Sequence, residues 1–94
     1  MNYGPLASIA DLYRRAIVRY GATAQMDQCV EEMAELTVEL QHAKRNRPHH
    51  AAEEVADCLI MVGQMRELFG PGDVDAIYAA KLHRLQQRLD GVEG

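Results

Sequence analysis

Apolar residues in the chain recur at alternating steps of three and four, which is the spacing of one face of an α-helix. One stripe consists of Met26, Val30, Met33, Thr37 and Leu40. A second stripe consists of Ala51, Val55, Cys58, Val62, Met65 and Phe69. Because no segment has the two-residue alternation of a β-strand, the sequence predicts an all-α fold.

Breaks in this periodicity divide the chain into four predicted helices. Ser8 and Asp11 have the spacing of a capping box, which predicts the start of the first helix. Asp73 is the expected N-cap of the last helix. The interrupting residues are Gly21, Pro48 and the run Gly70-Pro71-Gly72. The predicted helices cover about 8–20, 24–45, 49–69 and 73–90.

The length of 94 residues favours one domain, spanning 1–94, with its core at about 24–90. Without tryptophan and with a single phenylalanine, the core must be built from aliphatic residues and methionine. We expect a bundle of about four helices built on a long antiparallel helix pair. So short a chain buries little of its surface, so we expect oligomerisation to complete the core, as a homodimer or homotetramer. The apolar residues expected at that interface are Leu36, Ile60, Met61 and Leu68.

The charge balance of 14 acidic against 10 basic residues argues against a nucleic-acid polymer as partner. Cys29 and Cys58 lack the spacing of a disulfide framework, and we expect them to be small buried apolar side chains. Charged residues interrupt the N-terminal segment early, so we expect neither a signal peptide nor a membrane span. These features together predict a cytoplasmic protein.

Two groups of acids stand out on the two long helices. Glu32 with Glu35, and Glu54 with Asp57, are three residues apart and therefore share a helix face. If the two pairs converge, their mutual repulsion calls for a cation, and an all-oxygen ligand set favours Mg²⁺ or Mn²⁺. The alternative is that these acids form the solvated side of two amphipathic helices. Spacing alone leaves both interpretations open.

The complete pattern is Glu31-Glu32-x-x-Glu35, then 17 residues, then Glu53-Glu54-x-x-Asp57. It resembles the EExxE and EExxD motif of the MazG-like all-α nucleoside triphosphate pyrophosphohydrolases, especially their small single-domain phage and bacterial members. The resemblance extends from about Gln25 to Leu89. It implies Mg²⁺-dependent hydrolysis of a nucleoside triphosphate to the monophosphate and pyrophosphate, by subunits that contribute to each other's pockets.

The resemblance also implies roles for single residues. The implied metal ligands are Glu32, Glu35, Glu54 and Asp57, and the implied catalytic groups that support them or orient water are Glu31 and Glu53. The implied substrate-binding residues are Gln25, Lys81 and Arg88. Leu85 departs from the pattern, because many relatives carry an asparagine four residues after the lysine.

Other functions are compatible with the same residues. One is the related phosphoribosyl-ATP pyrophosphohydrolase activity, and another is a non-catalytic helical module for binding a metal or nucleotide or for oligomerisation. Glu39 and His42 form an ExxH pair, but a carboxylate-bridged di-iron site needs two such pairs and the sequence has one. His49 and His50 are expected to be solvated.

Overall fold

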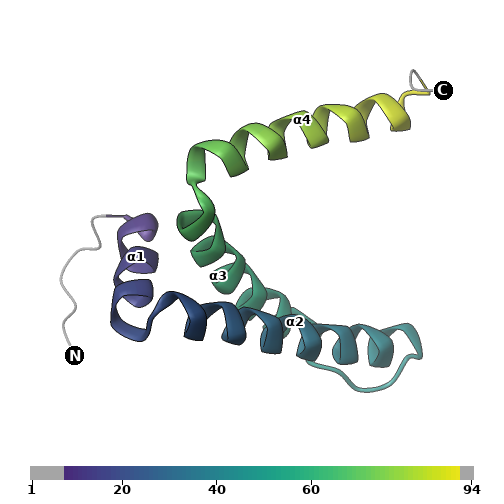
Figure 1. Cartoon of the computed structure of the whole chain (residues 1–94). Coiled ribbons are helices and arrows are strands. Elements are labelled where there is room, and N and C mark those ends of the chain that lie inside the picture. Colours follow the sequence, from purple (N-terminus) through teal and green to yellow (C-terminus); the bar gives the residue numbers. More distant parts are fainter. Residues whose placement is uncertain (1–7, 92–94) are drawn as a thin grey trace.

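The structure is a computed structural model that describes residues 8–91, and every regular element in that range is a helix (Figure 1). The elements are α1 (Ile9–Tyr20), α2 (Ala22–Lys44), α3 (Ala51–Phe69) and α4 (Pro71–Leu89). The predicted all-α class is therefore confirmed. Across residues 8–91, no helix combines the length and the apolar character that crossing a membrane requires.

The first two helices begin and end where the sequence predicts within two residues. Ser8 caps α1, its Oγ accepting a hydrogen bond from the backbone N–H of Asp11 at 2.9 Å. The carboxylate of Asp11 pairs with Arg14, rather than completing a capping box. Gly21 then adopts a φ of 96°, which L-residues other than glycine rarely adopt, and this turns the chain directly into α2.

The predicted N-cap of α4 is wrong. Gly70 occupies the N-cap position and Pro71 the first helical position, so Asp73 lies inside the first turn, where no side-chain cap hydrogen bond forms. Proline at the first helical position already has the helical φ and needs no donor there. The helix therefore begins three residues earlier than an aspartate cap at position 73 would place it.

Glu39 fixes the connection between α2 and α3. Its Oε2 accepts a hydrogen bond from the backbone N–H of His50 at 2.9 Å, just before α3 begins. His42 lies beside it, with its Nδ1 3.8 Å from the same oxygen. The ExxH pair therefore has a structural explanation: it ties the end of α2 to the start of α3.

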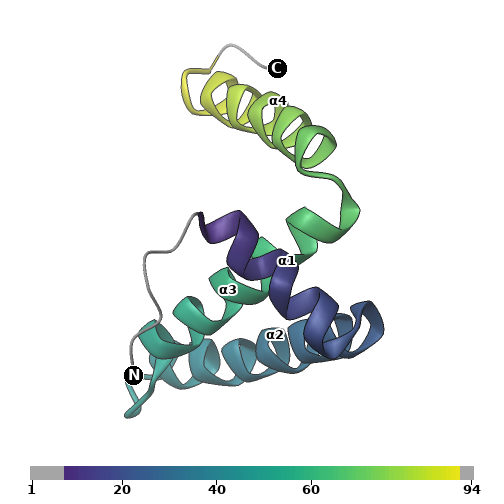
Figure 2. The ribbon, with the colours of Figure 1, turned by 90° about the vertical axis from the view of Figure 1, so that its left-hand side faces the viewer.

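The helices α2 and α3 form an antiparallel hairpin (Figure 2), and the small core lies between them. Cys29, Cys58 and Met61 are buried there, which confirms the prediction for both cysteines. Gln25 and Gln64 are buried as well, and Gln25 Nε2 donates a hydrogen bond to Gln64 Oε1 at 2.5 Å. A buried amide pair of this kind favours one register of the two helices, because any shift would leave both amides unpaired.

The apolar stripe predicted for α2 does not face α3. Val30 and Met33 are 66% and 53% exposed, whereas the face packed towards α3 carries Gln25, Cys29 and Leu36. That face lies about 100° around the helix from the stripe. Each long helix thus has two faces with apolar residues, and the hairpin covers only one of them.

Met61 corrects the expected subunit interface. It is 6% exposed, inside the hairpin core, and Leu36 and Leu68 are half-buried, so these residues are not surplus surface. Ile60, at 47% exposed, is the one of the four that remains on the outside.

The helices α1 and α4 both pack on α3, towards its C-terminal half. The ring of Tyr13 in α1 packs directly against Gly63, and Arg14 Nη1 lies 3.0 Å from Glu67 Oε2. Arg66 donates two hydrogen bonds to Asp75 of α4, at 2.7 and 2.5 Å. Among the described helices α4 contacts only α3, and it extends away from α2 (Figures 1 and 2).

Candidate metal centre

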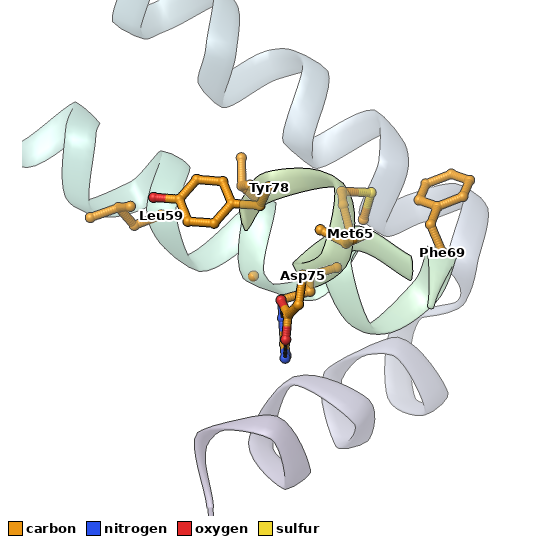
Figure 3. Close-up of a pocket in the computed structure, with 9 residues that line it drawn as sticks. Leu59, Met65, Phe69, Asp75 and Tyr78 are labelled. Carbon is orange, nitrogen blue, oxygen red and sulfur yellow. Dashed lines mark hydrogen bonds and ion pairs between the residues drawn. The ribbon is translucent and has the colours of Figure 1, made fainter. Parts of the chain in front are cut away.

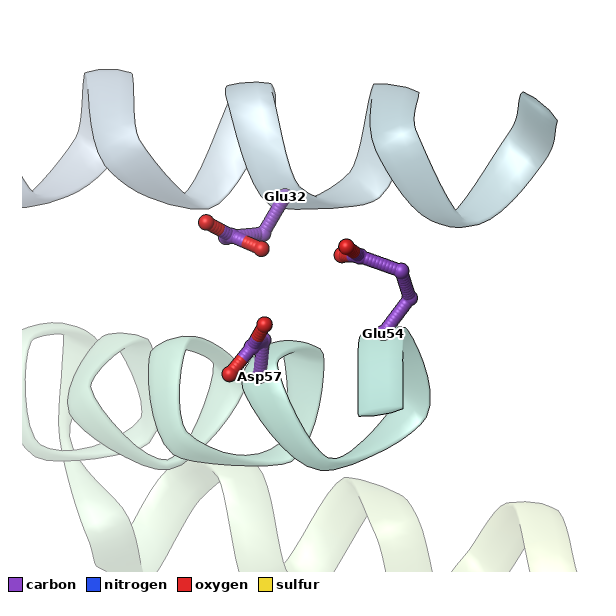
Figure 4. Close-up of side chains that lie close together, drawn as sticks. All are labelled: Glu32, Glu54 and Asp57. Atoms are coloured by element: carbon purple, nitrogen blue, oxygen red, sulfur yellow. The ribbon is translucent and has the colours of Figure 1, made fainter. Parts of the chain in front are cut away.

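Three carboxylates converge between the two long helices. Glu32 comes from α2, and Glu54 and Asp57 come from α3 (Figure 4). One oxygen from each lies within 4.8 Å of the other two. All three side chains are half-buried. The structure thus brings together three of the four acids that the sequence pattern singles out.

The hairpin core determines this convergence. Asp57 directly precedes the buried Cys58, whose Sγ donates a hydrogen bond to the backbone carbonyl of Glu32 at 3.3 Å. This contact places the turn of α2 that carries Glu32 beside the turn of α3 that carries Asp57. Glu54 lies one turn before Cys58 on the same side of α3. The acids therefore extend the core outward rather than lying on a solvated face.

The electrostatics of the cluster are unfavourable in the absence of a cation. Glu32 Oε1 accepts a hydrogen bond from Gln28 Nε2 at 2.9 Å, but Glu32 Oε2 and Glu54 Oε2 are buried and have no hydrogen-bond partner among residues 8–91. Burial, the adjacent carboxylate of Glu32 and the charges of Glu35 and Asp57 raise the pKa of Glu54 to about 7. Unpaired buried carboxylate oxygens are costly, so this arrangement needs a proton or a positive ion.

The effect of the cluster reaches the neighbouring thiol. Burial, together with the charges of Glu32 and Glu54, raises the pKa of Cys58. The thiol therefore keeps its proton, which it donates to the carbonyl of Glu32, and acts as a structural donor.

Glu35, the fourth predicted ligand, is exposed and outside the group of converging oxygens. It lies about 60° around α2 from Glu32, at the edge of the side that faces α3. Its charge nevertheless acts on Glu54. Glu31 and Glu53, the predicted catalytic acids, are both exposed on the outer sides of their helices.

The predicted substrate-binding residues are not gathered at the carboxylates of the same chain. Gln25 is buried in the hairpin, where its amide bonds to Gln64. Lys81 and Arg88 lie on α4, which contacts α3 but not α2. Gln28, which sequence reasoning missed, holds Glu32 by a hydrogen bond, and its spacing of four residues from Glu32 is the signal that could have identified it.

The donor chemistry of the cluster fits a hard divalent cation. Three carboxylates offer oxygen ligands only, and their side chains lie together between α2 and α3 (Figure 4). Mg²⁺ and Mn²⁺ match this set better than Zn²⁺, which favours nitrogen and sulfur ligands. Comparisons of the chain with protein-family models, with curated proteins and with solved structures find no match.

Proposed function

We propose that this protein binds Mg²⁺, or Mn²⁺, through Glu32, Glu54 and Asp57 and hydrolyses a nucleoside triphosphate to the monophosphate and pyrophosphate. The observation that carries the cation site is the pair of buried, unpartnered carboxylate oxygens in a cluster built from two helices. The resemblance of the acid pattern to the MazG-like pyrophosphohydrolases supports the choice of reaction.

The residues of the chain have distinct tasks in this proposal. Bound Mg²⁺ would offset the negative charge of the phosphate oxygens. Glu32 and Asp57 position the cation, and Glu54 joins them once it has lost its proton. Glu35 completes the ligand set by turning its exposed side chain towards Glu54, on which its charge already acts.

Phosphoryl chemistry of this kind asks the protein for positioning and charge rather than for a covalent nucleophile. Glu31 and Glu53 directly precede two of these ligands in the sequence, and their exposed carboxylates are proposed to orient an attacking water molecule by turning towards the cluster. Cys58 has no part in the reaction, because its raised pKa keeps it protonated. Gln25 is proposed to act on the substrate only through the position of α2.

The cationic partners of the phosphate chain are proposed to come from a second subunit. Within one chain, Lys81 and Arg88 lie on a helix that does not contact α2, whereas the cluster lies between α2 and α3. A homotetramer with a second interface on the carboxylate side of α3 would bring α4 of one copy to the carboxylates of another, and a homodimer would do so only if its interface lay on that side. The two cysteines are free and buried, and we place the protein in the reducing cytoplasm.

The test is pyrophosphate release from a panel of nucleoside triphosphates and phosphoribosyl-ATP, with Mg²⁺ and with a chelator. Asp57→Asn should lower turnover about 100-fold or more, because a cation ligand acts directly on the transition state. Asp27→Asn is the matched control, since Asp27 is an exposed acid of α2 outside the cluster, and it should retain full activity.

Circular dichroism should give the same helical content for both variants. Turnover of Asp57→Asn above about a tenth of the unsubstituted rate would refute the assignment. Cation binding without release of pyrophosphate from any substrate would leave a metal-binding module and exclude the enzyme. Turnover of phosphoribosyl-ATP alone would assign the related dedicated activity.

A further inference from the structure

The helix α4 exposes a continuous apolar stripe. Its residues Tyr78, Leu82, Leu85 and Leu89 follow one another at steps of four, three and four, so they lie on one face. Their exposed fractions range from 47% to 77%. No other described helix packs along this stripe, because α4 contacts only α3, near its own N-terminal end.

A groove of about 430 Å³ continues the stripe at that end (Figure 3). Leu59, Val62 and Phe69 line it from α3, and Val74 and Tyr78 line it from α4. Leu59 lies two residues after Asp57, about 160° away around α3, so the groove opens on the side of α3 opposite the carboxylates. Groove and stripe together form one apolar surface, which we call the α4 face.

The amount of exposed surface indicates a large missing contact. The chain exposes 7437 Å², whereas a compact monomer of 10.5 kDa exposes about 5,400 Å². The difference is of the same order as the area, about 1,000–2,500 Å², that each subunit buries in an obligate homodimer. The radius of gyration of 16.7 Å likewise exceeds the value of about 12 Å that a compact domain of this length has.

We propose that the α4 face is covered by α4 of a second copy of this chain, packed antiparallel about a two-fold axis. In this arrangement Leu85 and Leu89 of one copy fill the groove of the other, opposite Tyr78 and Val74 respectively. The axis then passes close to Leu82. The two copies make identical contacts through the same surface. The α4 face of each copy is therefore covered, and no apolar surface is left to add a third copy.

The charges along α4 favour this direction. Its N-terminal half carries Asp73, and also Asp75, which Arg66 of the same chain already pairs, and its C-terminal half carries Lys81, Arg84 and Arg88. Antiparallel packing places the acidic half of each helix beside the basic half of the other, and it opposes the two helix dipoles. Parallel packing would place like charges together.

The first experiment measures mass in solution by sedimentation of the full chain at micromolar concentration. The unsubstituted protein should have at least twice the 10.5 kDa mass of the chain. Leu85→Glu should weaken association about 30-fold or more, because it places an unpaired charge at the centre of the contact. Val18→Glu is the matched control, since Val18 is an exposed apolar residue of α1, and it should leave the mass unchanged.

The second experiment tests the direction of packing by oxidative cross-linking of single cysteines. Leu82→Cys should form a disulfide-linked dimer, because the two copies of this position meet at the axis. Leu89→Cys should not, because its two copies would lie about 22 Å apart at 1.5 Å per residue. The unsubstituted protein is the blank, since Cys29 and Cys58 are buried.

These results do not depend on catalysis, so the interface and the proposed activity can fail separately. A 10.5 kDa monomer, or association lost in Val18→Glu but kept in Leu85→Glu, would overturn the proposal. Cross-linking of Leu89→Cys as readily as Leu82→Cys would overturn the antiparallel arrangement.

Discussion

Binding of Mg²⁺ to the carboxylate cluster should release protons, in a number set by Glu54. Its pKa of about 7 means that the side chain is partly protonated at neutral pH. A cation ligand must be a carboxylate, so the proton has to leave as the cation binds. The perturbation is therefore the addition of Mg²⁺ to the cation-free protein at a series of pH values.

The number of protons released at each pH follows from the pKa of Glu54. A group with a pKa of 7 holds about 0.9 proton at pH 6, about 0.5 at pH 7 and about 0.1 at pH 8, and binding should release those amounts. The apparent affinity for Mg²⁺ should be about tenfold weaker at pH 6 than at pH 8 for the same reason.

The stability of the cation-free fold depends on pH in the opposite direction to the affinity for Mg²⁺. The folded state raises the pKa of Glu54 above its ordinary value, so it binds the proton more tightly than the unfolded state. In the cation-free protein the contribution of this group to stability is fully present below pH 4.5 and is lost as the pH rises through 7.

Isothermal titration calorimetry in two buffers with different ionisation enthalpies measures the proton count directly. Glu54→Gln should abolish the release, whereas Glu53→Gln, a substitution of the exposed neighbouring acid, should leave it unchanged. The reasoning is refuted if Mg²⁺ binds at pH 6 without releasing a proton, or if Glu54→Gln releases as many protons as the unsubstituted protein.

Two further predictions concern the packing that positions the site. Gly63→Ala should destabilise the protein by about 1–3 kcal/mol in urea unfolding, because the new Cβ would lie 2.3 Å from Tyr13 Cε2; an unchanged midpoint would show that α1 moves away without cost. Gln25→Ala should cost about 1–3 kcal/mol in the same assay, because it leaves the buried amide of Gln64 without its partner. Restoration of stability by Gln64→Leu in the Gln25→Ala background would identify the unpaired amide as the cause.

Helix boundaries were predictable because local chemistry determines them. Ser8 caps α1, and Gly21 and Gly70 take up positive φ values at the ends of α1 and α3, all within the sequence neighbourhood of the helices they bound. The starts of α2 and α3 differ from the predicted ones by two residues each. The wrong N-cap at Asp73 arose from two competing local signals, and the proline at the first helical position determined the start of α4.

The packed faces were not predictable from periodicity. The stripe containing Val30 and Met33 is the more apolar side of α2, yet the hairpin buries the side containing Gln25 and Cys29. Hydrophobic periodicity identifies the apolar face of a helix, but it does not identify the element that packs on that face. Where a helix has two such faces, the loop and the buried amide pair decide which one the chain itself covers.

The candidate site was predictable in part for the same reason. Glu54 and Asp57 lie on either side of the line along which α3 faces α2, so both reach the cluster. On α2 only Glu32 lies close to that line, and Glu35 is rotated away from it. The spacing of three residues was the same in both pairs, and only the rotation of each helix about its axis, a tertiary property, distinguished them.

The helix α3 carries the acids on one side and lines the apolar groove on the other, and this separation has an evolutionary consequence. Its inner side carries the acids and the core residues Cys58 and Met61, and its outer side lines the groove with Leu59 and Val62. Because the two sides share few positions, substitutions on one can accumulate without changing the chemistry of the other. Descendants of this chain could therefore exchange one association partner for another while the acidic centre stays as it is.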